Sequence, residues 1–196
     1  MIKAEYILLS AQIPTCNECP GIYVDMSGHM ITTDGYTMGV FNTGTPMPWA
    51  FRIMPNKEMT KACRKDTNGY VNGSHILSAN GDILYTFVEG DIVVATDEYN
   101  WKKPFEVLNM AWLVPGAMDT KYFSPFHFKT RCCNSINWYC VDDKYPMYAL
   151  LRGYPEFIGV FAPTKSYLRD EDTDEGGEEL QPLLIPEWAR LLCPGM

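Results

Sequence analysis

Two glycine-centred turns, separated by only a few residues, constrain the fold of this chain more than any other feature. Ser27-Gly28 and Asp34-Gly35 divide residues 22–41 into three short apolar segments. A Ser-Gly or Asp-Gly pair between such segments is typical of a tight β-hairpin turn, because glycine adopts the positive φ angles that other residues avoid. The stretch therefore predicts three short antiparallel strands joined by two hairpins.

The composition favours a globular protein with reduced cysteines. The chain has 196 residues, of which 46% are hydrophobic, and this supports a sizeable core. No apolar run approaches the roughly 20 residues that span a bilayer. The start, Met1–Glu5, has an early acid and does not resemble a secretion signal. Seven cysteines, an odd number, then favour free thiols, and we expect a cytoplasmic protein without membrane contact.

The net charge of −8 argues against nucleic-acid binding, but the charge is unevenly distributed. Residues 169–179 hold seven acids and one arginine, so −6 lies in this segment and about −2 remains elsewhere. This segment also contains Gly176-Gly177, and we interpret it as a flexible acidic linker. We expect it to join a body, residues 1–168, to an apolar C-terminal tail, residues 180–196.

The rest of the chain predicts single helices between small antiparallel sheets. Helices are expected at 2–13, at 56–65 with Asn56 as N-cap, and at 123–135 behind Ser124-Pro125. Residues 68–73 are interpreted as a turn-rich break and 99–110 as mostly extended. This order predicts an α+β fold. The further expected strands are 50–54, a meander of 75–79, 83–88 and 92–96, and then 138–141, 148–152 and 157–161.

Several stretches resemble the bacterial DNA polymerase sliding clamp, the β subunit, in the same order along the chain. Thr33-Asp34-Gly35 and the residues after it resemble the Thr-Asp-Gly-His-Arg-Leu element of that family. The resemblance spans about residues 2–165. The other matching stretches are 2–12, the strand-Pro-basic lead 51–57, the meander 75–96, the Arg-Arg-Val-like segment 99–108, the helix start 123–128 and the Val-Met-Pro-like strand 159–165.

The resemblance implies a fold of repeated strand-helix-strand-strand-strand units, with antiparallel sheets and with helices on one face that line a central hole. A clamp has three domains, and this chain holds about one and a half. The strand that precedes the first helix of the family is missing here. We therefore expect a homo-oligomer if a ring forms.

The resemblance also implies a pocket for short peptides that end in Leu-Phe, carried by replication or repair proteins. Burial of such Leu and Phe anchors contributes about 1.5–3 kcal/mol per side chain. Tyr36 and Thr37 stand where the family has His and Arg, and Ala162 replaces a Met, so the preferred peptide is expected to differ. The implied pocket residues are Thr33, Gly35, Tyr36, Thr37, Met38, Pro104, Val107, Val160, Phe161, Ala162 and Pro163.

A basic stripe on the second helix predicts contact with double-stranded DNA. Lys57, Lys61, Arg64 and Lys65 fall in one arc at helical spacing, whereas Met59, Ala62 and Cys63 fall opposite. Such a stripe suits phosphates, through charge and without sequence readout. The alternative is a solvated amphipathic surface helix. On the third expected helix, Lys129 and Arg131 would extend the same wall.

Other motifs do not favour catalysis or a cofactor. Cys16-x-x-Cys19 is half of a zinc motif, but the adjacent Cys132-Cys133 cannot easily supply the other half, because neighbouring helical residues point about 100° apart. His29, His75 and His127 are scattered without a recognisable nucleophile. Asp34 is expected to accept hydrogen bonds from nearby backbone N–H groups. We expect no metal, no cofactor and no enzyme activity.

Three hypotheses follow from these residues. The first is a clamp-like, non-enzymatic scaffold in DNA replication, encoded by a phage or mobile element. The second is an interaction module that keeps the clamp fold without threading DNA, as a decoy or inhibitor of host replication or defence. The third is a hydrolase that uses a histidine. In addition, residues 181–185 resemble a clamp-binding peptide that either docks in the pocket or packs as an ordinary C-terminal segment.

Overall fold

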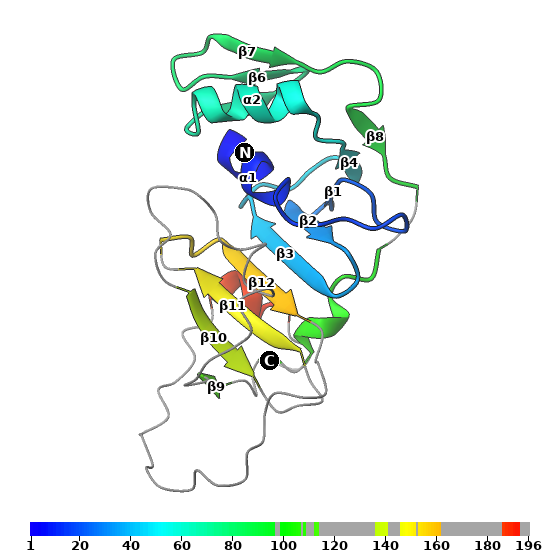
Figure 1. Ribbon diagram of the computed structural model, residues 1–196, viewed down its shortest axis with the longest axis vertical. Coiled ribbons are helices and arrows are strands. Elements are labelled where there is room, and N and C mark those ends of the chain that lie inside the picture. The colour runs from blue at the N-terminus through cyan, green and yellow to red at the C-terminus, as the bar shows by residue number, and fades with distance from the viewer. Residues whose placement is uncertain are drawn as a thin grey trace, which may run out of the picture. The chain divides into compact units, whose positions relative to one another are not determined.

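The chain forms two compact units, Met1–Tyr99 and Asn100–Met196, and each is described by itself (Figure 1). The computed structural model describes residues 1–96, 99–106, 108, 112–113, 136–140, 146–151, 153–161 and 186–192. The expected boundaries of the acidic linker and of the tail, at 168/169 and 179/180, lie outside these residues, as does the expected helix 123–135.

The two predicted hairpins form the centre of the first unit. Strands β1 (Ile22–Val24), β2 (His29–Thr33) and β3 (Thr37–Asn42) pair antiparallel and consecutively. Both turn glycines adopt positive φ, 84° at Gly28 and 88° at Gly35. Their turns set the register, and the strands are buried along almost their whole length. The prediction for residues 22–41 is therefore confirmed.

The first unit contains two sheets. Of the strands after the hairpins, β4 and β8 belong to one sheet, and β5, β6 and β7 belong to the other. In one sheet the strand order is β8-β4-β1-β2-β3, with β4 at Phe51–Ile53 and β8 at Ile92–Val94. In the other it is β5-β6-β7, at Tyr70–Asn72, His75–Leu77 and Ile83–Thr86.

Two sequence predictions for this region are wrong. Residues 75–96 are not one meander, because β8 leaves β7 and pairs with β4 instead. Residues 68–73 are not only a break, because they contain β5. Its turn-like composition hid a strand that gains a partner far away in sequence: Lys3 bridges Tyr70, and the Val71 N–H donates to the Ile2 carbonyl at 2.9 Å.

Two short helices pack on each other and on these sheets (Figure 1). Helix α1 (Ala4–Ser10) lies against β2 and is almost wholly buried, and the Tyr6 ring stacks on Phe41 with centroids 5.0 Å apart. Helix α2 (Lys57–Lys65) lies against β7. Both helices were predicted, although α1 is shorter than expected at each end.

One side chain ties the start of α2 to the strands around it, and we call its contacts the Asn56 node. Asn56 Oδ1 accepts from the Met59 N–H at 2.8 Å, as expected of an N-cap. Its Nδ2 donates to the Tyr85 hydroxyl at 2.8 Å and to Asp91 Oδ1 at 2.9 Å. The other Asp91 oxygen accepts from the Tyr85 hydroxyl and the Val88 N–H. The node thus joins α2, β7 and the turn before β8.

The described part of the second unit is an antiparallel sheet with two short helical segments. The strand order is β9-β10-β11-β12, at Trp112–Leu113, Ile136–Cys140, Met147–Leu151 and Phe157–Phe161. The last three confirm the predicted strands. The expected extended segment 99–110 instead contains a 3-10 turn, η1 (Lys103–Phe105), because Pro104 favours a helical first turn. In α4 (Glu187–Arg190), Trp188 Nε1 donates to the Pro155 carbonyl at 2.9 Å.

The chain is therefore an α+β protein with small, mostly antiparallel sheets and few helices among its described residues. The structure describes only 186–192 of the tail, so the docking hypothesis for 181–185 lies outside it.

The Asn56 node predicts an unusually costly cap mutation. Asn56→Ala removes the cap of α2 and leaves the buried Asp91 carboxylate with one donor fewer. We expect the free energy of unfolding to fall by about 2–3 kcal/mol, more than the ~1 kcal/mol of an ordinary cap. Urea denaturation followed by circular dichroism measures this. Asn68→Ala, at an exposed turn position, is the matched control and should cost under about 0.5 kcal/mol.

Candidate functional site

The predicted basic stripe forms one exposed face of α2, which we call the α2 basic face. Met59, Ala62 and Cys63 are buried, so the amphipathic pattern is confirmed. One acid, Glu58, is also exposed and lies 4.0 Å from Lys61 Nζ, with both side chains more than two-thirds exposed. Such a solvated pair contributes little, so the cations stay available to an external anion. The exposed basic residues are Lys57, Lys61, Arg64 and Lys65.

The other helices add nothing to this face among the described residues. Helix α1 is buried from Tyr6 to Ser10, and the one cation beside it, Lys3, lies over the Tyr6 ring at 5.0 Å. Lys129 and Arg131, expected to extend the wall, lie outside the described residues.

The Thr-Asp-Gly turn is a rigid projection with one exposed aromatic ring. Asp34 Oδ1 accepts from the backbone N–H groups of Tyr36 at 2.9 Å and Thr37 at 2.7 Å, as predicted. Thr33 Oγ1 accepts from the Gly35 N–H at 3.0 Å. Thr33, Thr37 and Met38 are buried, whereas the Tyr36 side chain is 77% exposed. The turn can therefore offer a partner mainly Tyr36.

The other half of the expected peptide pocket belongs to the second unit. Val160 and Phe161 are buried in β12. Pro104 is half-buried, and its carbonyl accepts from the Tyr148 hydroxyl. Val107, Ala162 and Pro163 lie outside the described residues. The expected residues are thus divided between the two units, and each group is placed only within its own.

The Cys16–Cys19 segment is organised around a buried arginine. The Cys19 N–H donates to the Cys16 carbonyl at 3.2 Å, and Arg52 Nη1 donates to Cys19 Sγ and to the Pro20 carbonyl, each at 3.4 Å. The Arg52 guanidinium also lies 5.2 Å from the centre of the Tyr23 ring. Across the residues that the structure describes, no three or more His, Cys, Asp or Glu side chains cluster as a metal site would require.

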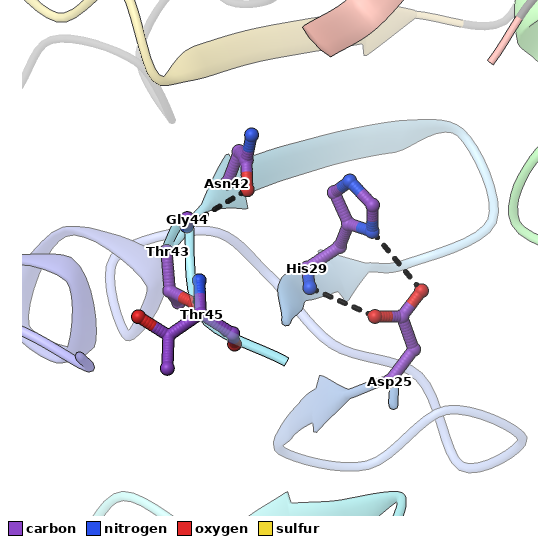
Figure 2. A network of polar contacts seen from close by, with 6 residues as sticks. All are labelled: Asp25, His29, Asn42, Thr43, Gly44 and Thr45. Atoms are coloured by element: carbon purple, nitrogen blue, oxygen red, sulfur yellow. Dashed lines mark hydrogen bonds and ion pairs between the residues drawn. The ribbon is translucent and has the colours of Figure 1, made fainter. Parts of the chain in front are cut away.

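His29 belongs to a polar pair that spans the first hairpin turn (Figure 2). The carboxylate of Asp25 accepts from the His29 backbone N–H at 2.8 Å, and its second oxygen lies 3.1 Å from His29 Nδ1. Both side chains are about nine-tenths buried. The loop of Thr43–Thr45 lies beside this turn, and the Thr43 N–H donates to the Gly28 carbonyl. These contacts fix the turn, which gives the pair a structural function.

A cavity of about 580 Å³ in the first unit was not predicted, and we call it the α1–α2 cavity. It lies between the end of α1, the loop that follows, the start of β1 and the N-terminus of α2. Two of its lining residues, Ser10 and Thr32, are fully buried, and their hydroxyl groups have no hydrogen-bond partner. An unpaired buried hydroxyl costs about 1–3 kcal/mol, so these two groups require an explanation.

Sequence reasoning missed this cavity because its parts are far apart along the chain. The available signal was weak: a serine at the end of the apolar run of α1 and a threonine in the centre of an otherwise apolar strand. Either residue alone is common in such elements. Only the packing of α1 on β2 brings these two residues to one space.

No protein-family model matches this sequence, and no curated protein matches it either. Among the residues that the structure describes, none of the helices combines the length and the apolar character that crossing a bilayer requires.

Helix α2 also carries a group that makes stability fall at high pH. Burial raises the pKa of the Cys63 thiol from its ordinary 9.0 to about 12. The folded state therefore favours the neutral thiol, and this contribution is complete below pH 9 and lost as the pH rises toward 12.

We expect the free energy of unfolding of the wild type to decline between pH 9 and 12, and that of Cys63→Ala to decline less steeply. Urea denaturation at several pH values measures both slopes. Tyr85 and Tyr99, whose pKa values burial also raises, titrate in both proteins and cancel in the comparison. Parallel pH profiles would contradict the assignment to Cys63.

Proposed function

We propose that this chain is a non-catalytic, clamp-like scaffold that contacts DNA phosphates through the α2 basic face and binds partner proteins through a surface that includes the Thr-Asp-Gly turn. The proposal rests on three features. They are the order of elements, the pairing of the segment before each helix with the first strand after the other helix, and the charge of α2. It places the protein in DNA replication or in the control of replication.

The pairing of strands around α1 and α2 supports the clamp-like part of the proposal most directly. The strand before α2, β4, pairs with β1, which is the first strand after α1. In the same way, the residue before α1, Lys3, bridges to β5, which is the first strand after α2. Each of these two helices is followed by four strands, β1–β4 after α1 and β5–β8 after α2, and β4 is the strand that leads into α2. This is the arrangement expected of two strand-helix-strand-strand-strand repeats, with the first strand of the first repeat reduced to one bridge.

The α2 basic face supports the DNA-binding part. Four cations project from one side of a helix that the Asn56 node holds in place, with one acid among them. Cations on a rigid helix neutralise phosphates at less entropic cost than cations on a loop, and each contact releases counterions. The proposed binding is therefore weak, independent of sequence and strongly dependent on salt.

Removing two of these cations should weaken DNA binding and flatten its salt dependence. For Lys61→Gln with Arg64→Gln, we expect lower affinity for a short duplex of arbitrary sequence. The slope of log K against log salt should fall by about 2, because each lost phosphate contact contributes about 0.9. Fluorescence anisotropy at several salt concentrations measures both quantities.

The matched control removes two exposed cations elsewhere, by Lys103→Gln with Arg190→Gln, and should leave the slope unchanged. If the wild type shows no salt-sensitive association and is monomeric by light scattering, the interaction module without DNA is the better assignment. That alternative has one structural support: β8 carries exposed Ile92, Val93 and Val94 along a strand at the end of its sheet within the first unit.

The protein-binding part of the proposal depends on Tyr36. We expect a Gln-Leu-Ser-Leu-Phe peptide to bind, and Tyr36→Ala to weaken it about tenfold through loss of buried apolar area. Isothermal titration calorimetry measures the affinity. Trp49→Ala, which removes another exposed aromatic ring of the same unit, is the control. Equal affinities for the wild type and Tyr36→Ala would remove the turn from the peptide site.

A further inference from the structure

We propose that strand β8 binds an extended segment of another protein, an apolar β-strand with Lys or Arg at both ends, which adds to the sheet as a further strand. This binding goes beyond the proposed function, because it involves neither α2 nor the Thr-Asp-Gly turn. Strand β8 forms one end of its sheet within the first unit, with β4 as its neighbour (Figure 1). Three properties of β8 carry the proposal: outward backbone groups, exposed apolar side chains and flanking acids.

Strand β8 is held firmly on its β4 side. The Asp91 carbonyl, just before the strand, accepts from the Met54 N–H at 2.8 Å, and the Ala95 N–H, just after it, donates to the Ala50 carbonyl at 3.1 Å. The Asp91 side chain also belongs to the Asn56 node, which fixes the start of the strand a second time. A strand that is already extended and ordered loses little further entropy when a peptide pairs with it.

The same bonds identify the backbone groups of β8 that face outward. Along an antiparallel pair, alternate residues direct both their N–H and their C=O toward the neighbouring strand. Asp91 and Ala95 do so, and Val93 follows the same alternation. Ile92 and Val94 therefore direct their N–H and C=O groups away from β4. Within the described part of the chain no other strand pairs with β8, so two donors and two acceptors are open to an incoming strand.

The side chains of β8 give this edge an apolar surface without the usual protection. Ile92, Val93 and Val94 are all exposed, so apolar area is present on both faces of the strand. Natural edge strands commonly carry a lysine or a proline that prevents pairing, and residues 92–96 contain no lysine, arginine or proline. Such an edge suits strand addition, in which the main chain supplies affinity and alternate side chains supply specificity.

The charge of the sequence around β8 selects a basic partner. Glu89 and Asp91 precede the strand, and Asp97 and Glu98 follow it along the chain. No lysine or arginine occurs anywhere in the stretch 66–101. Because acids stand on both sides of the strand in sequence, cations at both ends of a bound segment are favoured, whichever direction the segment runs.

A second copy of this chain fits the edge less well than a basic segment. Two β8 strands paired antiparallel about Val93 would satisfy the same backbone groups. Each copy, however, brings the same acids and no lysine or arginine within 66–101, and like charges across paired strands are destabilising. Arg52 lies opposite Val93 on β4, but it is buried and donates to Cys19 Sγ and the Pro20 carbonyl. The occupant is therefore a segment of a different protein.

The experiment titrates the peptide Lys-Lys-Val-Thr-Val-Thr-Val-Lys-Lys into the ¹⁵N-labelled full chain, followed by NMR. We expect the amides of Ile92 and Val94 to shift, because their N–H groups gain acceptors. A peptide with glutamate in place of every lysine tests the charge. A peptide with proline in place of the central valine tests the backbone bonds, because proline has no N–H. Each of these two should bind at least about tenfold more weakly.

Two substitutions at one position test the edge within the protein. Val94→Lys adds a cation to the edge and should weaken the lysine peptide at least about tenfold. Val94→Pro removes an outward N–H that β4 does not use, so it should weaken binding and still allow folding. Ile83→Lys on β7, in the other sheet, is the matched control, because Ile83 and Val94 are both 62% exposed, and it should leave the affinity unchanged.

Val93→Pro provides the contrast in stability within the same strand. It removes an N–H directed at β4, so it should lower the thermal midpoint more than Val94→Pro does. Glu89→Gln, which removes an exposed acid before β8, should weaken the lysine peptide about twofold and leave the thermal midpoint unchanged.

The proposal is overturned if the β8 amides do not shift, if the glutamate or proline peptide binds as tightly as the lysine peptide, or if Val94→Lys leaves the affinity unchanged. Shifts of the β8 amides that grow with protein concentration in the absence of peptide, together with a doubled mass by light scattering, would also overturn it, in favour of pairing between two copies of this chain.

Discussion

The first unit depends on the side chain of Asn56, because this one amide joins α2, β7 and the turn before β8. Its oxygen caps α2 and its amide bonds Tyr85 and Asp91, so the helix, β7 and the turn before β8 share one fixed point. That turn directs β8 away from β7 and back to β4. One amide thus fixes the direction of α2, and with it both the basic face on the outside of the helix and the cavity at its N-terminus.

The features predicted correctly from sequence are those encoded by neighbouring residues. The Gly28 and Gly35 turns need a local property, tolerance of positive φ, and the Asn56 cap needs only an amide before an amphipathic segment. The basic face follows from a 3.6-residue period. Each of these signals lies within about ten consecutive residues. For that reason the predicted hairpins and α2 agree with the structure.

The failures involve partners that the local sequence does not indicate. Strand β5 forms a tight hairpin with β6 and is also bridged by residues 2–3, more than sixty positions away, although its own composition indicates a turn. Strand β8 has the apolar pattern of a meander strand, but Asp91 at its start is held by α2. The cavity needs Ser10 and Thr32 together, and neither has a local signature. For β8 and the cavity, tertiary packing overrides local preference.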